Sequence, residues 1–266
     1  MRFRHTEAVW AEFPELAAGV LHTTVLHTTV PDTTVPDTGD PASAPSGAGS
    51  RVAAYTARAT ARLTGTTEAE LPEIHAWRRA FARMGLRPTQ YRCASESLLR
   101  RLRREGALPA IHPVVDLCNA LSMAYAVPVA VLDADRIAGP LLEVRHARGD
   151  ERYTTFGGAI EHPAPGEVVF ADSAGQAHAR RWTNRQSGHS AVSAHTRRIF
   201  VVTEAMHEGG AETVRELLAV IAAELAAHGA ADPVTAVLTA SAPEFAFDAP
   251  SGADGAPRPA EEHRPA

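Results

Sequence analysis

Apolar residues recur at helical spacing in the first half of the chain. Between residues 66 and 125 they fall on one face of three successive segments, and a glycine follows each of the first two. This spacing predicts amphipathic helices over about 66–85, about 95–106 and from Pro113 onward. The third segment is apolar nearly all round, so we expect that helix to be buried.

From residue 127 the apolar pattern changes to short runs separated by Gly and Pro. Runs of this length bounded by turn residues are typical of β-strands. The predicted strands cover 127–132, 141–144, 152–156, 167–170, 177–182 and 199–203. A final segment with helical spacing predicts a helix over about 211–228.

Two segments lack a pattern that could bury a face. Leu21-His22-Thr23-Thr24-Val25 is repeated at once in residues 26–30, and residues 39–50 are almost entirely Gly, Pro, Ala and Ser. We therefore expect a disordered insert over 22–50 within a single domain of residues 1–228. Residues 229–266, which turn to Ala, Pro, Gly and acidic side chains, are expected to form a largely disordered tail.

Bulk properties narrow the possible function classes. The chain has 266 residues, a net charge of −5 and a pI of about 6.2. This balance argues against a constitutive, non-specific nucleic-acid binder but leaves room for a local basic patch. Every basic residue other than His is Arg, so lysine Schiff-base chemistry is excluded. No apolar run approaches the ~18 residues of a membrane span, and the N-terminus lacks the apolar region of a signal peptide. We therefore expect a cytoplasmic protein without membrane contact.

Sequence motifs for cofactors and metals are missing. Cys93 and Cys118 are far apart and lie among helix-like apolar residues, which predicts buried free thiols. There is no dinucleotide-binding glycine pattern, no phosphate loop ending in Lys, no His-Glu-x-x-His and no paired Cys-x-x-Cys. The Ser of Gly188-His189-Ser190-Ala191 lacks the flanking glycines of a nucleophile elbow. We expect neither a metal nor a cofactor.

A polar cluster occupies residues 180–198, between two strand-like apolar runs. It contains five Arg together with Asn, Gln, Ser, Thr and His. Arginine binds carboxylate and phosphate through two parallel hydrogen bonds. The cluster is therefore either a site for an anionic ligand or a solvated rim of a hairpin.

Asp116 and Asn119 interrupt the apolar helix that begins at Pro113. Their spacing of three residues places them on one face. Buried polar groups need hydrogen-bond partners. The pair is thus an internal brace, a pocket wall, or both.

Taken in order, these residues resemble those of a known family. The matching set is Asp116, Asn119, Leu132-Asp133, Arg145, Gly149, Gly166-Glu167-Val168-Val169, Arg181-Trp182, Arg185-Gln186-Ser187 and Thr196. The chain resembles free-standing B3/B4-domain proteins, relatives of a module in the β subunit of bacterial phenylalanyl-tRNA synthetase, over about residues 5–225. The resemblance implies an α+β fold, a B3/B4-like sandwich of mixed β-sheets with helices packed on one side. It also implies a pocket between the Asp116 helix and the polar cluster.

In the synthetase this module is an editing site, where a wrongly attached tyrosine is hydrolysed from the tRNA. The resemblance therefore implies a tRNA-editing-like domain that hydrolyses the ester of misacylated tRNA in trans, an aminoacyl-tRNA deacylase. The expected partner is tRNA or aminoacyl-tRNA, held by its acceptor end. The modules that aminoacylate are not found, so we do not expect a ligase.

The resemblance also suggests roles for individual residues. The catalytic candidates are Asp116 and Asn119, which would hold the ammonium group of the amino acid or a water, and His189, which could assist or be structural. The substrate-binding candidates are Arg181, Arg185, Gln186, Ser187, Ser190, Thr196 and Glu167. If Arg181 or Arg185 pairs with Asp116 or Glu167 in a closed, dry network, the cluster is structural instead.

Two positions depart from the synthetase pattern. Ala130 stands where the synthetase has its editing-site His, and its editing-site Glu aligns near Gly188. Two alternatives to a deacylase therefore stay open. One is an enzyme or binder of a small amino-acid derivative that reuses the pocket, and the other is a non-catalytic tRNA-binding module that passes its substrate to a partner.

Overall fold

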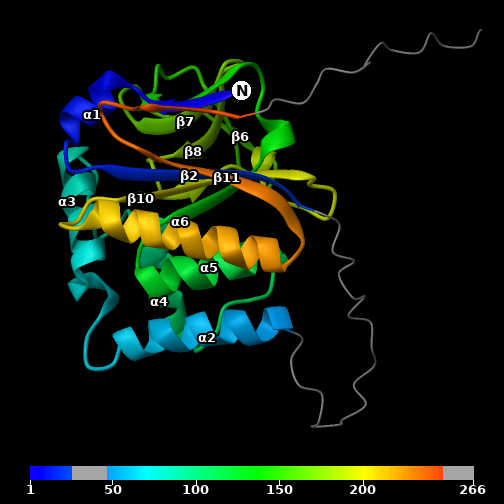
Figure 1. Cartoon of the computed structure of the whole chain (residues 1–266). Helices are drawn as coiled ribbons and strands as arrows, with labels where there is room; N and C mark the ends of the chain where they lie inside the picture. Colours follow the sequence, from blue (N-terminus) through cyan, green and yellow to red (C-terminus); the bar gives the residue numbers. More distant parts are fainter. Residues whose placement is uncertain (26–46, 248–266) are drawn as a thin grey trace, which may run out of the picture.

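The computed structural model describes residues 1–25 and 47–247. Two β-sheets, sheet A and sheet B, and a set of helices lie in layers (Figure 1). Sheet B lies between sheet A and the helices α5 and α6, and α2 packs on α5 on the side away from the sheets. The helices are α1 (Glu7–Glu12), α2 (Gly47–Arg62), α3 (Pro72–Arg83), α4 (Ala94–Glu105), α5 (Pro113–Tyr125) and α6 (Gly210–Ala227). Single 3-10 turns are η1 (Glu68–Glu70), η2 (Ala134–Arg136) and η3 (Gly188–Ser190).

Sheet A is mixed, and sheet B is antiparallel throughout. Sheet A has the order β12-β1-β4-β7-β8-β5-β6, with β9 paired to β8, and its β1–β4 and β5–β8 pairs are parallel. Sheet B has the order β11-β2-β10-β3. The strands of sheet A are β1 (Arg2–His5), β4 (Leu141–His146), β5 (Arg152–Thr154), β6 (Ile160–Glu161), β7 (Val168–Asp172), β8 (Gln176–Arg180), β9 (Arg185–Gln186) and β12 (Glu244–Ala246). Those of sheet B are β2 (Ala17–Val25), β3 (Val129–Asp133), β10 (Arg198–Ala205) and β11 (Ala230–Leu238).

Sheet B forms the middle layer because its strands are apolar on both faces. Along β10, Phe200 and Val202 belong to the core between the sheets, whereas Ile199 and Val201 belong to the core beneath α5 and α6. Successive side chains of a strand point to opposite faces, so an unbroken apolar run needs cover on both sides. Each large side chain buried in this way stabilises the fold by about 1.5–3 kcal/mol.

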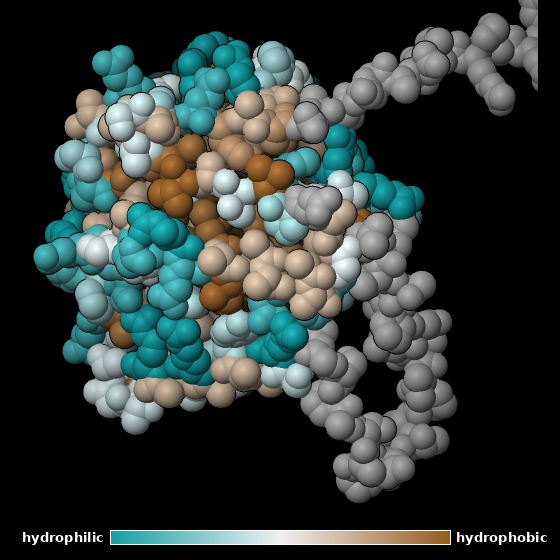
Figure 2. Space-filling view, in the orientation of Figure 1, coloured by the Kyte–Doolittle hydropathy of each residue, from teal (hydrophilic) through white to brown (hydrophobic). Residues whose placement is uncertain are grey.

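The predicted α+β sandwich with helices on one side is confirmed. The four predicted helices correspond to α3, α4, α5 and α6, and the six predicted strands to β3, β4, β5, β7, β8 and β10, with small shifts at their ends. Cys93 and Cys118 are free and buried, as predicted. In the space-filling view of the same side, apolar residues gather over the strands in the upper half, and hydrophilic residues cover much of the lower left (Figure 2).

The part of the chain that the structure describes adds two negative findings. None of its helices is long and apolar enough to cross a membrane. It also contains no group of three or more His, Cys, Asp or Glu side chains placed to hold a metal ion.

Residues 230–247 belong to the folded structure, so the predicted boundary at residue 228 is wrong. β11 pairs with β2 along most of its length, and β12 pairs with β1. Phe247 follows β12 and stacks on Phe200, with ring centroids 4.6 Å apart. The high Ala content concealed this region, because Ala has a low strand propensity and the edge of β2 supplies the pairing that the sequence alone does not show.

The predicted insert over 22–50 is also too long at both ends. β2 continues to Val25, and α2 begins at Gly47. Residues 26–46 of the insert and residues 248–266 of the predicted tail lie outside the described residues.

The role of the C-terminal strands is testable with Phe247→Ala. Phe247 is buried and Phe156 is 74% exposed, so Phe156→Ala is the matched control. Emptying a buried aromatic site costs about 3 kcal/mol, whereas an exposed site costs under about 0.5 kcal/mol. Urea unfolding should therefore show a large loss of stability for Phe247→Ala only. Equal stabilities of the two variants would mean that residues 230–247 are not part of the core.

Candidate functional site

The polar cluster begins with a strained turn at the end of β8. Arg181 and Trp182 have φ angles of 47° and 56°, in the left-handed region. Each such residue costs about 1–3 kcal/mol unless its surroundings hold it in place. The main-chain nitrogen of Trp182 donates to Val168 O at 2.7 Å, and that of Arg181 donates to Glu167 Oε1 at 2.9 Å. The turn is therefore fixed by β7 and by the Glu167 carboxylate.

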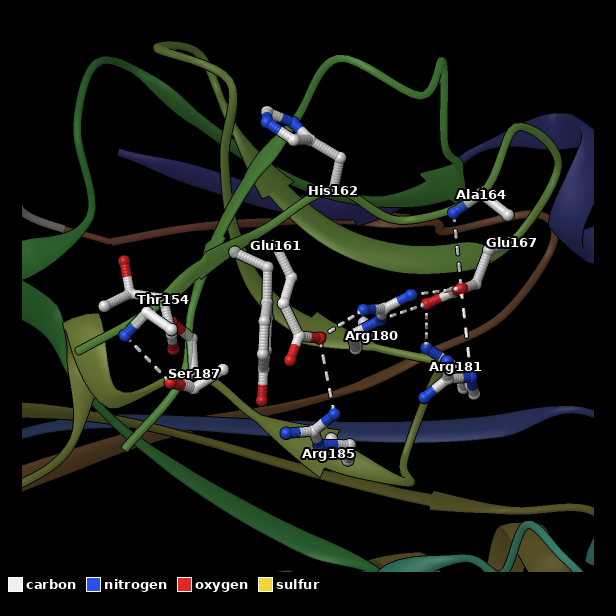
Figure 3. A network of polar contacts seen from close by, with 12 residues as sticks. Thr154, Glu161, His162, Ala164, Glu167, Arg180, Arg181, Arg185 and Ser187 are labelled. Carbon is white, nitrogen blue, oxygen red and sulfur yellow. Dashed lines mark hydrogen bonds and ion pairs between the residues drawn. The ribbon is translucent and has the colours of Figure 1, made fainter. Parts of the chain in front are cut away.

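Arg180 and Glu167 form a buried brace rather than a ligand site. Arg180 donates to the two Glu167 oxygens at 2.9 and 3.0 Å, and to Glu161 at 2.6 Å (Figure 3). The Arg180 side chain is 8% exposed and that of Glu167 6%. The hydrogen bond to Glu167 raises the pKa of Arg180. Since Arg180 and the Arg181 main chain occupy its carboxylate, Glu167 has a structural role that differs from the substrate contact expected from the sequence.

Arg181 and Arg185 are held more loosely. The Arg181 guanidinium lies over the ring of Tyr91, 4.6 Å from its centroid, and its Nε is 3.9 Å from Glu167. Arg185 is 42% exposed, and its Nη1 is 3.4 Å from Glu161, which is 36% exposed. An ion pair this exposed contributes little stability. Arg185 can therefore exchange Glu161 for another anion at small cost.

A small cavity lies between the two sheets beside this turn, and we call it the intersheet cavity. It has a volume of about 70 Å³ and combines apolar walls with a few polar groups. Its lining residues are Ala94, Pro128, Val129, Ala130, Phe170, Ala179, Trp182, Thr183, Asn184, Arg185, Gln186, Val202 and Glu204.

Three polar side chains of the intersheet cavity differ in how they are satisfied. The Gln186 amide donates to Val131 O at 2.8 Å, which leaves its oxygen as an acceptor. The Thr183 hydroxyl is buried and has no hydrogen-bond partner within the described chain. Such a group is costly unless a ligand or a water satisfies it.

Glu204 is the third polar group of the intersheet cavity, and it is not among the residues expected from the sequence. Its residue is 2% exposed, and its Oε1 accepts from Trp182 Nε1 at 3.0 Å. The same oxygen lies 2.6 Å from His5 Nε2. Among the described residues, no hydrogen bond uses the other oxygen, Oε2. A buried carboxylate oxygen of this kind favours a cationic or hydrogen-bond-donating ligand.

Asp116 and Asn119 do not share this cavity. They line a separate groove of about 770 Å³ between α2, α5 and residues 107–110, which we call the helix groove. Asp116 accepts from the main-chain nitrogen of Ile111 at 3.0 Å, so its brace role is present. The single pocket expected from the sequence is therefore not formed. Asp116 lies in the first turn of α5, about 13 Å along the helix axis from Tyr125 at the other end.

Ser187 and Thr196 are occupied by local structure. Ser187 is buried, donates to Thr154 O at 2.9 Å and accepts from the main-chain nitrogen of His189 at 3.2 Å. Thr196 is also buried and donates to Asp133 Oδ2 at 2.7 Å. Both hydroxyls fix the loop after β9, and neither lines the intersheet cavity.

η3 places His189 and Ser190 away from the intersheet cavity. His189 is exposed, and its ring centroid is 5.9 Å from that of the buried His178. His178 Nε2 lies 3.2 Å from Asp172 Oδ2, and burial lowers the pKa of His178. The Ser190 hydroxyl is buried without a partner in the described chain. Of the residues expected from the sequence, only Arg185 and Gln186 line the intersheet cavity.

The division between brace and ligand site predicts different effects for two neighbouring arginines. Arg180→Ala removes both guanidinium hydrogen bonds from the buried Glu167 carboxylate, and removing one partner of a buried ion pair costs about 3–5 kcal/mol. Arg185→Ala breaks an exposed ion pair with Glu161 and a contact 5.5 Å from the Tyr153 ring centroid, and it should cost under about 1 kcal/mol. Chemical unfolding of both variants measures the difference. A stability loss as large for Arg185→Ala as for Arg180→Ala would assign both arginines to the brace.

Comparison with known proteins agrees with the resemblance. Over 75 residues the chain is 36% identical to the phenylalanine–tRNA ligase beta subunit of Carboxydothermus hydrogenoformans, covering 28% of this chain and 9% of that protein. Over 61 residues it is 43% identical to the corresponding subunit of Geobacter metallireducens, covering 23% of this chain and 8% of that protein. The matched segments thus span less than a tenth of these relatives.

One solved structure adds a weaker likeness. It is an N-terminal fragment of the phenylalanyl-tRNA synthetase beta subunit from Pyrococcus horikoshii, with a TM-score of 0.36 and 16% identity over 44% of this chain and 40% of that one. The family model of the B3/4 domain matches residues 76–216, more than half of the sequence. The chain therefore belongs to the B3/4 domain family.

Proposed function

We propose that this B3/4 domain hydrolyses the ester bond of misacylated aminoacyl-tRNA in trans. The observation that carries the proposal is the intersheet cavity, which Arg185 and Gln186 line together with the buried Glu204. The curated relatives that the chain matches are beta subunits of phenylalanine–tRNA ligase. A tRNA partner follows from that kinship, and it belongs to the proposal.

The proposed site uses residues from both sheets. Arg185, which is exposed, would hold a phosphate or ribose oxygen of the acceptor end. The aminoacyl group would enter the intersheet cavity. Asp116 and Asn119, which line the helix groove, have no part in this arrangement.

The proposed reaction is a simple hydrolysis. The oxygen of a water forms a bond to the ester carbonyl carbon, and the bond between that carbon and the ribose oxygen breaks. One proton of the water goes to the ribose oxygen, and the other is released with the free amino acid. An aminoacyl ester is already activated, so positioning the water and stabilising the oxyanion supply most of what is needed. Thr183 and Gln186, which line the intersheet cavity, would orient that water.

A second candidate is a binder or enzyme of a small amino-acid derivative. It is supported by the small size of the intersheet cavity and by the net charge of −5. A tRNA-binding protein should lose affinity steeply with added salt. A small-molecule protein should instead be stabilised against heat by free amino-acid derivatives and not by tRNA. Tight tRNA binding without hydrolysis would indicate a non-catalytic module.

The proposal is tested with a panel of mischarged tRNAs at micromolar protein. We expect hydrolysis of at least one member above the spontaneous rate. Arg185→Ala should lower that rate about tenfold, equivalent to about 1.4 kcal/mol of transition-state stabilisation. Arg101→Ala is the matched control, because Arg101 is exposed on α4 and pairs only with Glu105; its rate should stay within about twofold of the unmodified protein. Hydrolysis of no member would contradict the proposal, and equal effects of the two substitutions would contradict the assignment of the site.

A further inference from the structure

We infer that the intersheet cavity takes a small aminoacyl group with a free ammonium, of the size of glycyl, alanyl or seryl. This inference rests on the proposed function, because it assumes that the aminoacyl group enters this cavity. It specifies the substrate class by the size and charge of the site.

The volume of the intersheet cavity limits the size of the group that it can hold. The cavity holds about 70 Å³, whereas an apolar cavity that accepts a benzene ring measures about 150 Å³. A phenyl or phenol ring therefore exceeds the space, and a methyl or hydroxymethyl group fits it. Ala130 and Ala179 line the cavity on sheets B and A.

The aromatic wall of the intersheet cavity is rigid. Trp182 is completely buried, and it makes edge-to-face contacts with Phe13 at 4.8 Å and with Trp77 at 5.3 Å between ring centroids. Its indole nitrogen is fixed by the hydrogen bond to Glu204. Phe170, on the sheet A side, is 2% exposed. Close-packed side chains of this kind do not retreat without cost, so a larger ligand would have to displace core residues.

The charge of the Glu204 carboxylate favours a ligand with an ammonium group. The ring nitrogens of Trp182 and His5 face Glu204 Oε1, and no hydrogen bond in the described chain uses Oε2. A buried carboxylate oxygen without a hydrogen-bond donor attracts an ammonium group and disfavours an acidic side chain. The Thr183 hydroxyl, buried and unpartnered, adds one more group that can bond to the ammonium or to a seryl hydroxyl. An α-amino group beside a short side chain would satisfy both the Glu204 carboxylate and the Thr183 hydroxyl.

The test compares hydrolysis of alanyl- and seryl-tRNA with that of tyrosyl- and phenylalanyl-tRNA. We expect the small aminoacyl groups to be released at least about tenfold faster, since a misfit in an apolar pocket is worth about 10–200-fold. N-acetyl-alanyl-tRNA, which lacks the ammonium, should be released at least about tenfold more slowly than alanyl-tRNA.

Two variants sharpen the test. Ala130→Leu should fill the cavity and lower the alanyl-tRNA rate at least about tenfold, and it is tolerable because Ala130 is only partly buried. Ala138→Leu adds the same side chain at an exposed position outside the cavity and should leave the rate unchanged. Glu204→Gln keeps an acceptor for Trp182 but removes the charge, and it should reduce the preference for alanyl over N-acetyl-alanyl.

The outcomes separate the inference from the proposed function. Hydrolysis of tyrosyl- or phenylalanyl-tRNA as fast as alanyl-tRNA keeps the function and overturns the inference. If no tRNA is hydrolysed, the function fails and thermal stabilisation decides the occupant of the cavity. Stabilisation by L-alaninamide, but not by N-acetyl-L-alaninamide or L-tyrosinamide, would support the inference, and no stabilisation by L-alaninamide would overturn it.

Discussion

The buried carboxylate of Glu204 links the fold of this protein to its candidate site. It lies on the central strand pair of sheet B and receives Trp182 from the strained turn after β8, while His5 approaches from β1 of sheet A. The Glu204 side chain thus connects sheet A and sheet B beside the intersheet cavity. A buried charge is costly unless its partners stay in place, so the positions of β1, β10 and the turn after β8 depend on one another.

The polar cluster contains bracing residues and an exposed arginine, and residue type alone does not distinguish them. Arg180 and Glu167 hold the turn in its left-handed conformation, and Ser187 fixes the following loop. Arg185 lies between Arg180 and Ser187 in the sequence but keeps an exposed guanidinium. The braces fix the turn beside the intersheet cavity, and in the proposed site the exposed arginine would contact an anion. This division follows from burial and pairing rather than from residue type.

Periodicity was sufficient for helices α3 to α6 and for strands β3, β4, β5, β7, β8 and β10, because these elements bury apolar residues. It failed for β11, whose short side chains show their role only beside β2. The site was harder to foresee. Gln186 and Arg185 follow from the cluster, but Glu204 pairs with His5, which is 199 residues away in the sequence. A lone acidic residue at the end of an apolar strand gives no sign of such a partner.

The central claim is that the intersheet cavity, not the helix groove, receives an aminoacyl group. The most direct measurement is a crystal structure with 3′-alanylamino-3′-deoxyadenosine, a stable analogue of the charged tRNA end. The account predicts the ammonium within about 3 Å of Glu204 Oε2, at hydrogen-bond distance, with the methyl group against Ala130 and the adenosine toward Arg185. Density for the analogue in the helix groove beside Asp116 and Asn119, with the intersheet cavity unchanged, would contradict it.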